Sequence, residues 1–211
     1  MTRGVKQSRA ETDSGRIGPD RLPWLPETRW TPEQRRHAEE IIKGPRGALV
    51  SPFVPLLRSP ELMSHAQRMG EYLRYRSALG QRLSEFAILL TARHWSQPVE
   101  WSIHAPIAER EGVSRETIEA ISEDRCPPNL TDDESTVYAF CNELQCEHAV
   151  SDRTWLATIE RFGERGAVDL IGIVGYYSFL SMVMNAARTE VPHSSAPSLP
   201  GRNTNGTRPE A

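Results

Sequence analysis

The stretch Gln81–His104, QRLSEFAILLTARHWSQPVEWSIH, carries the pattern on which the fold class depends. Its first part is apolar on nearly every side, which predicts a helix over residues 81–95 that is buried almost all round. Pro98 then suits the first turn of a second helix, predicted over residues 97–111. Because only a short turn separates these two helices, we expect them to be neighbours in space.

The rest of the chain repeats this helical pattern behind recognisable start signals. Thr31 followed by Pro32 and Gln34 predicts a capping box, and Pro60 after a serine predicts another helix start. Apolar residues follow at helical spacing, and no run of β-alternation competes with them. The sequence therefore predicts an all-α protein with about seven or eight helices. Further cap-like starts stand at Ser114, Thr131 and Ser151.

The length of 211 residues indicates one globular domain, which we place at residues 21–192. Residues 1–20 lack the apolar core of a secretory signal and predict a disordered tail, so we expect a cytoplasmic protein. Residues 193–211 are rich in Pro, Ser, Gly, Asn and Thr and predict a second disordered tail.

Charge and cysteine content exclude several classes of partner. The 25 basic and 28 acidic residues are spread through the chain, which argues against nucleic-acid and membrane binding. The apolar segment 170–184 is shorter than the ~20 residues of a spanning helix, so we expect a core or subunit-interface helix. Cys126, Cys141, Cys146 and His148 match no zinc spacing, and neither metal nor cofactor is expected.

One face of the second predicted helix carries a row of polar groups. Gln97, Glu100 and His104 stand at positions i, i+3 and i+7, which share a helix face. In the preceding helix, Glu85 lies on an apolar stripe, where a buried carboxylate needs a partner or a raised pKa. The short turn between the helices predicts that Glu85 approaches this row.

These residues also carry a family resemblance. LSEFAILLTARHW (83–95) followed by QPVEWSIHAPIAEREGVS (97–114) resembles the signature region of the carboxymuconolactone decarboxylase family, which includes alkylhydroperoxidase D. The segments 51–74 and 176–192 are similar to the family's flanks, so the resemblance covers roughly residues 44–192. It implies a compact helical domain of the alkylhydroperoxidase D type and a homo-oligomer, either a trimer or a hexamer.

The resemblance assigns site residues but removes one chemistry. In the family's peroxidase branch a Glu precedes a Cys-x-x-Cys pair, and a His follows the second Cys by four positions. Glu85 and His104 match that Glu and that His, whereas Gln97 and Glu100 stand at the two cysteine positions. Thiol peroxidase chemistry needs a thiolate nucleophile and a resolving thiol, so this departure argues against it.

The retained groups suit cofactor-independent acid–base chemistry, such as decarboxylation of a small organic acid or lactone. Loss of carbon dioxide leaves a carbanion that a positioned donor must protonate, and His104 is the best donor on this face. Glu85 would orient His104 or relay its proton, and Glu100 would serve as a second base. Substrate contacts are expected from Gln97, Trp101 and Arg93.

Two other functions stay open at the level of sequence. An alkylhydroperoxidase or peroxiredoxin-like antioxidant protein would turn over peroxide through a cysteine pair. A non-catalytic oligomeric ligand-binding protein would hold a small acid without consuming it. Each site residue also has a structural interpretation, since a buried His104 or Glu85 can simply satisfy a partner inside a helix interface.

Overall fold

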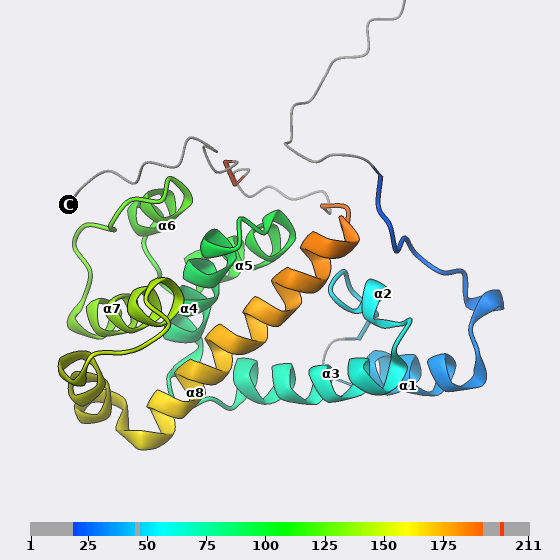
Figure 1. Ribbon diagram of the computed structural model, residues 1–211, viewed down its shortest axis with the longest axis horizontal. Coiled ribbons are helices and arrows are strands. Elements are labelled where there is room, and N and C mark those ends of the chain that lie inside the picture. The colour runs from blue at the N-terminus through cyan, green and yellow to red at the C-terminus, as the bar shows by residue number, and fades with distance from the viewer. Residues whose placement is uncertain (1–18, 45–46, 192–198, 201–211) are drawn as a thin grey trace, which may run out of the picture.

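The computed structural model describes residues 19–44, 47–191 and 199–200 of the 211. Over this part of the chain it holds a short 3-10 helix, η1 (Glu27–Arg29), eight α-helices and no strand (Figure 1). The all-α prediction of seven or eight helices is confirmed. The α-helices are α1 (Pro32–Lys43), α2 (Phe53–Leu56), α3 (Pro60–Tyr75), α4 (Gly80–His94), α5 (Pro98–Arg110), α6 (Arg115–Ser122), α7 (Asp132–Cys146) and α8 (Asp152–Ala187).

The predicted tails lie largely outside the described residues. Of residues 1–20 only 19–20 are described, and of residues 193–211 only 199–200. The Pro200 carbonyl accepts a hydrogen bond of 2.7 Å from Arg93 Nη1, and Leu199 packs against the hydrophobic core.

Helix starts follow the predicted capping chemistry at most positions. Thr31 Oγ1 accepts from the Gln34 amide while the Gln34 side chain accepts from the Thr31 amide, which completes a capping box at α1. Thr131 and Glu134 form the same reciprocal pair at α7. Ser59 precedes α3 as expected, but within the described chain its side chain makes no capping bond. Side-chain caps also begin α6 and α8, from Ser114 and Ser151.

Helix α4 is the centre of the molecule. It packs against α3, α5, α6, α7 and α8, and most of its residues from Leu83 to Arg93 are buried. The prediction of a helix buried almost all round is therefore confirmed. Because these five helices surround α4, a polar residue on α4 is enclosed by protein unless it points to an opening.

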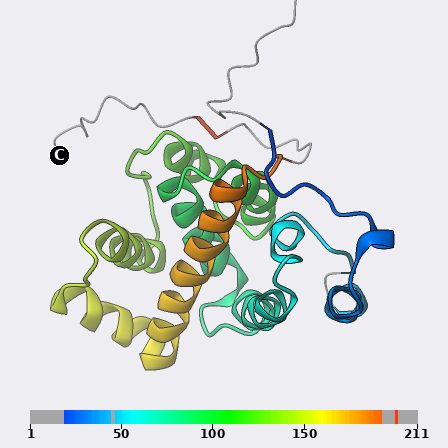
Figure 2. The same ribbon diagram turned by 45° about the vertical axis from the view of Figure 1, so that its right-hand side comes forward.

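Helix α8 crosses the body over α4 (Figures 1 and 2). It spans 36 residues and changes direction at Gly163, whose φ of 68° lies in the left-handed region that glycine adopts without strain. By length and composition α8 could cross a membrane, yet 56% of its most apolar window is buried inside the molecule. A core helix that is mostly buried passes the same test of length and composition.

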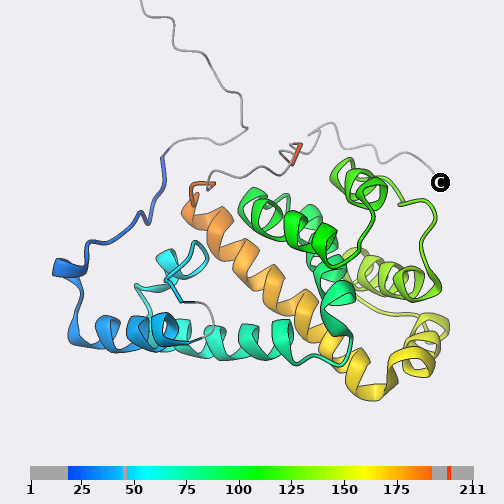
Figure 3. The same ribbon diagram turned by 180° about the vertical axis from the view of Figure 1, so that it is seen from behind.

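The first described residues lie along one edge of the body and reach the end of α8 (Figure 3). The Arg21 backbone amide donates to the Ala187 carbonyl at 2.7 Å, and Arg21 Nη1 donates to Ala186 at 3.0 Å. Arg58 Nη1 holds the same arm through the Leu22 carbonyl at 3.3 Å. The two bonds from Arg21 satisfy carbonyl groups that the last turn of α8 leaves without helical partners.

Helices α3 and α8 meet at Gly70 so closely that no side chain fits there. A Cβ on Gly70 would lie 2.2 Å from the Tyr176 hydroxyl oxygen and 2.5 Å from Tyr176 Cζ. We predict that Gly70→Ala lowers the free energy of unfolding by about 1–3 kcal/mol, because the buried ring must move. Denaturant unfolding measures this change.

Gly175→Ala is the matched control, since a Cβ there meets nothing within 4 Å. Gly175 is exposed on the same helix α8, and alanine there should raise the free energy of unfolding by roughly 0.5–1 kcal/mol. Equal free energies of unfolding for the two variants would contradict the prediction, because they would show that the Tyr176 ring moves aside without destabilising the protein.

Candidate functional site

The side chain of His104 lies between two carboxylates. His104 Nδ1 is 2.6 Å from Glu85 Oε2, and His104 Nε2 is 3.3 Å from Glu100 Oε2. The exposed fractions of Glu85, Glu100 and His104 are 0%, 1% and 4%. The expected approach of Glu85 to the polar row of α5 is therefore confirmed, and the three groups form one buried network.

The turn between α4 and α5 creates this arrangement. Ser96 adopts a positive φ of 48°, which reverses the chain, and the Gln97 amide donates to the Ala92 carbonyl at 2.8 Å. The Gln97 side chain then caps α5 by accepting from the Val99 amide at 2.7 Å. Helix α5 consequently packs back along α4, which places Glu100 and His104 over Glu85.

Charge explains the protonation state of His104. Burial alone lowers the pKa of this imidazole, but Glu85 and Glu100 outweigh that effect and raise it from 6.5 to about 9. Both ring nitrogens therefore carry protons at neutral pH and donate to the two carboxylates. Arg74 supplies a second positive charge, with its Nε 3.9 Å from Glu85 Oε1.

Helix α8 closes the site with an aromatic residue. The Tyr177 ring meets the His104 ring edge to face, with centroids 5.1 Å apart and planes at 87°. Burial, followed by the charges of Glu100 and Glu85, holds the pKa of the Tyr177 phenol well above its ordinary 10. Tyr177 therefore stays neutral and offers a proton donor beside two carboxylates.

Sequence reasoning did not select Arg74 or Tyr177. Arg74 stands in the last turn of α3, where a basic residue is ordinarily explained by the helix dipole. Tyr177 stands four residues after Ile173 and three before Leu180, on an apolar stripe. Neither position carries a local signal, because both reach the site through tertiary packing.

The three predicted substrate contacts have different surroundings. Both functional groups of the Gln97 amide are used, since Oε1 caps α5 and Nε2 donates to Asn185 Oδ1 at 2.8 Å. Trp101 is 1% exposed and belongs to the hydrophobic core. Arg93 lies two turns beyond Glu85, and its Nε is 3.9 Å from Asp124 Oδ1.

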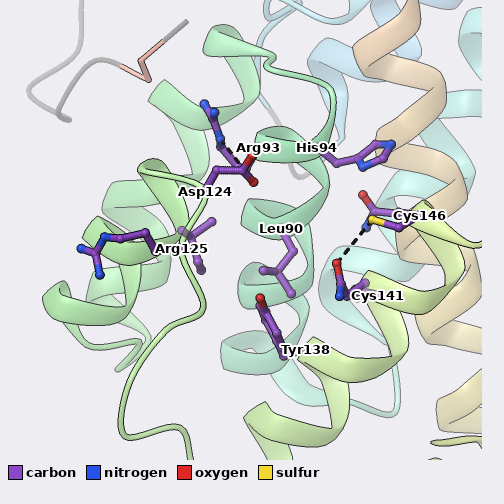
Figure 4. A pocket seen from close by; sticks show the side chains of 11 residues that line it. Leu90, Arg93, His94, Asp124, Arg125, Tyr138, Cys141 and Cys146 are labelled. Atoms are coloured by element: carbon purple, nitrogen blue, oxygen red, sulfur yellow. Dashed lines mark hydrogen bonds and ion pairs between the residues drawn. The ribbon is translucent and has the colours of Figure 1, made fainter. Parts of the chain in front are cut away.

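Arg93 instead lines a cavity of about 70 Å³ between α4, α6 and α7 (Figure 4). Cys141 and Cys146 line the same cavity, which His104, Glu85 and Glu100 do not. Burial raises the pKa of the Cys141 thiol well above its usual range, which leaves it un-ionised. Cys141 and Cys146 thus line a cavity that does not include the imidazole a peroxidase cycle would use.

The buried network retains unsatisfied polar atoms. Within the described residues, Glu85 Oε1, Glu100 Oε1 and Arg74 Nε have no hydrogen-bond partner. Buried polar atoms without partners are costly, so they mark places where a bound group improves the free energy. Over the same part of the chain, no group of three or more His, Cys, Asp and Glu residues is arranged to hold a metal ion.

Comparisons with known proteins do not identify the chain. Neither the models of known protein families nor the curated proteins give a significant match. The geometry of the network and the motif resemblance therefore carry the functional argument.

Proposed function

We propose that this chain is a carboxymuconolactone decarboxylase-like protein that performs cofactor-independent acid–base catalysis on a small organic acid or lactone. The observation that carries the proposal is the buried imidazole of His104, which contacts Glu85 through one ring nitrogen and Glu100 through the other.

The network has the parts that decarboxylation requires. When the bond between the substrate's α-carbon and its carboxylate breaks, the electron pair stays on that carbon as an enolate and carbon dioxide leaves. The His104 imidazolium donates its Nε2 proton to the carbon, and water later restores that proton. Glu85, bonded to Nδ1 at 2.6 Å, fixes the ring and keeps the imidazolium stable.

The charge balance of the network is compatible with an anionic substrate. The carboxylates of Glu85 and Glu100 are offset by the imidazolium of His104 and the guanidinium of Arg74, so the network is close to neutral. A substrate carboxylate is repelled by two groups and attracted by two others. During the reaction the negative charge moves from the carboxylate to the α-carbon, where the His104 imidazolium stabilises and protonates it, and this favours the transition state.

Carbon dioxide release tests the proposal directly. Purified protein is incubated with β-keto acids and carboxylated lactones, and dissolved carbon dioxide is measured against protein carrying His104→Gln. Release that depends on His104 supports the assignment, whereas no release from either class of compound argues against decarboxylation.

The antioxidant alternative gives a separate prediction. Replacing Cys126, Cys141 and Cys146 together by serine should leave the decarboxylase activity within about twofold of wild type, since the hydrogen-bond partners of His104 are carboxylates and not thiols. Peroxide consumption measured on the same two proteins is the companion assay. Rapid peroxide reduction by the wild type that disappears in the triple variant would overturn the proposed chemistry.

A non-catalytic role is favoured by one observation, the near-complete burial of the network. With His104 only 4% exposed, a substrate reaches it only after side chains move. Under this alternative Glu85, His104 and Glu100 hold α4 and α5 together, and the protein binds a small acid without consuming it. Saturation binding without product formation distinguishes this role from catalysis.

We also propose that the protein assembles as a homo-oligomer, a trimer or a hexamer. Val168, Ile171 and Met182 are exposed apolar residues on one face of α8, and Met69 on α3 is a further one. When a second copy covers this apolar stripe, the stripe is removed from water and the free energy falls.

Light scattering is predicted to give several times the 23.8 kDa mass of one chain. Val168→Lys combined with Ile171→Glu should lower that mass to the monomer while far-UV circular dichroism stays unchanged. A well-folded wild-type monomer at low micromolar concentration would contradict the assembly.

A further inference from the structure

Two polar rows face each other across the site. Helix α5 carries Gln97, Glu100 and His104, and α8 carries Tyr177, Ser181 and Asn185 at positions i, i+4 and i+8. Ser181 is fully buried, with an exposed fraction of 0%. A second polar row on an otherwise apolar helix needs an explanation.

Two contacts fix how the rows are aligned. Gln97 Nε2 donates to Asn185 Oδ1 at 2.8 Å, and seven residues later His104 meets Tyr177. Residue numbers rise from 97 to 104 along α5 while those of the contacted residues on α8 fall from 185 to 177. The two helices therefore run in opposite directions. Glu100 on α5 and Ser181 on α8 are the members of the two rows that lie between these contacts.

The middle of this alignment holds two polar atoms without partners. Neither Glu100 Oε1 nor Ser181 Oγ has a hydrogen-bond partner among the described residues, and each atom is buried. The other oxygen of Glu100 is committed to His104. The residues at the two ends of the rows therefore contact each other directly. Between them, Glu100 Oε1 is an acceptor without a donor, and the Ser181 hydroxyl can donate.

We propose that Glu100 Oε1 and Ser181 Oγ form a subsite for a single hydroxyl group. The bound hydroxyl donates its proton to Glu100 Oε1 and accepts a hydrogen bond from Ser181, which satisfies both atoms. Either a water molecule or a hydroxyl of the substrate can make these two hydrogen bonds. Only occupation by a substrate hydroxyl rests on the proposed function. Ser181 is then a positioning residue that acts on His104 through Glu100.

A crystal structure of the full chain tests the subsite without any assay of activity. In the wild type, an ordered oxygen is expected within about 2.6–3.2 Å of both Glu100 Oε1 and Ser181 Oγ. Ser181→Ala should lose this oxygen, and Ser178→Ala, the same change three residues earlier on α8, should keep it. A wild-type map without an oxygen bridging the two atoms overturns the proposal.

The titration of His104 gives an independent readout in solution. Without the hydrogen bond that the bridging hydroxyl donates, Glu100 concentrates its charge on His104, so Ser181→Ala should raise the pKa of His104 by about 0.5 units. Ser178→Ala should leave it unchanged. The midpoint is followed by the ¹⁵N shifts of the imidazole. No difference between the two variants would show that Ser181 does not act through Glu100.

Glycolate and acetate, which differ by one hydroxyl, separate the two sources. If a substrate hydroxyl occupies the subsite, glycolate binds more tightly than acetate and Ser181→Ala removes most of an advantage of about tenfold. If the two acids bind equally and the ordered oxygen persists, the occupant is water. The crystallographic test of the subsite does not depend on catalysis. A failure of the proposed decarboxylation can therefore be told apart from a failure of the proposed subsite.

Discussion

His104→Gln is expected to lower turnover by about two to four decades, because general acid catalysis typically supplies ~10²–10⁴-fold. Glutamine retains a hydrogen-bonding group of similar reach but cannot transfer the proton that Nε2 delivers. The measurement is kcat under substrate saturation on the compound found by carbon dioxide release. Unchanged turnover would return His104 to a purely structural role.

A double-mutant cycle with Glu85→Gln shows whether the pair acts as one unit. Glu85 binds His104 at 2.6 Å, so its replacement alone should cost less than His104→Gln and add little to it. Multiplicative losses would show two independent contributions. The melting temperature of each variant is the control, because removing His104 leaves two buried carboxylates with one fewer cation.

Stability is predicted to fall as the pH rises from about 6.5 to about 9. The folded protein raises the pKa of His104 from 6.5 to about 9, so it binds this proton more tightly than the unfolded chain. The resulting stabilisation is fully present below pH 6.5 and is lost as the pH passes through 9. This rise in the pKa of His104 corresponds to about 3 kcal/mol in the free energy of unfolding.

Urea unfolding across this pH range measures the effect, and Glu85→Gln provides the comparison. The variant loses the first charge that raises the pKa of His104, so its stability should change much less between pH 6.5 and 9. The other groups around the ring are Arg74 from α3, Glu100 from α5 and Tyr177 from α8. Parallel stability curves for the two proteins would exclude His104 as the titrating group.

Local chemistry explains why the helices could be predicted. Thr31 with Gln34 and Thr131 with Glu134 each satisfy backbone amides within three residues, so the information for these helix starts is contained in the motif itself. The same holds for the link between α4 and α5, which is short enough to force their contact. Glu85 and His104 came together in the structure for that reason.

Residues that reach the site from distant helices could not be predicted in the same way. Arg93 lies on the same helix as Glu85, but its direction toward Asp124 depends on where α6 packs. Arg74 and Tyr177 reach the network from α3 and α8, and their side-chain directions follow from packing between helices. Helical periodicity gives the face of a residue and not the neighbour that the face meets.

The bond between Arg21 and Ala187 ties together residues 166 apart in sequence, with Arg21 Nη1 reinforcing it at Ala186. During synthesis the arm leaves the ribosome before the helices that follow it, and its partner at the end of α8 exists only when nearly the whole domain has emerged. Because the two partners are so far apart in sequence, we predict that this contact forms in the last steps of folding. Shortening the arm would therefore fray the end of α8, next to Asn185 and its bond to Gln97, without changing how fast the central helices assemble.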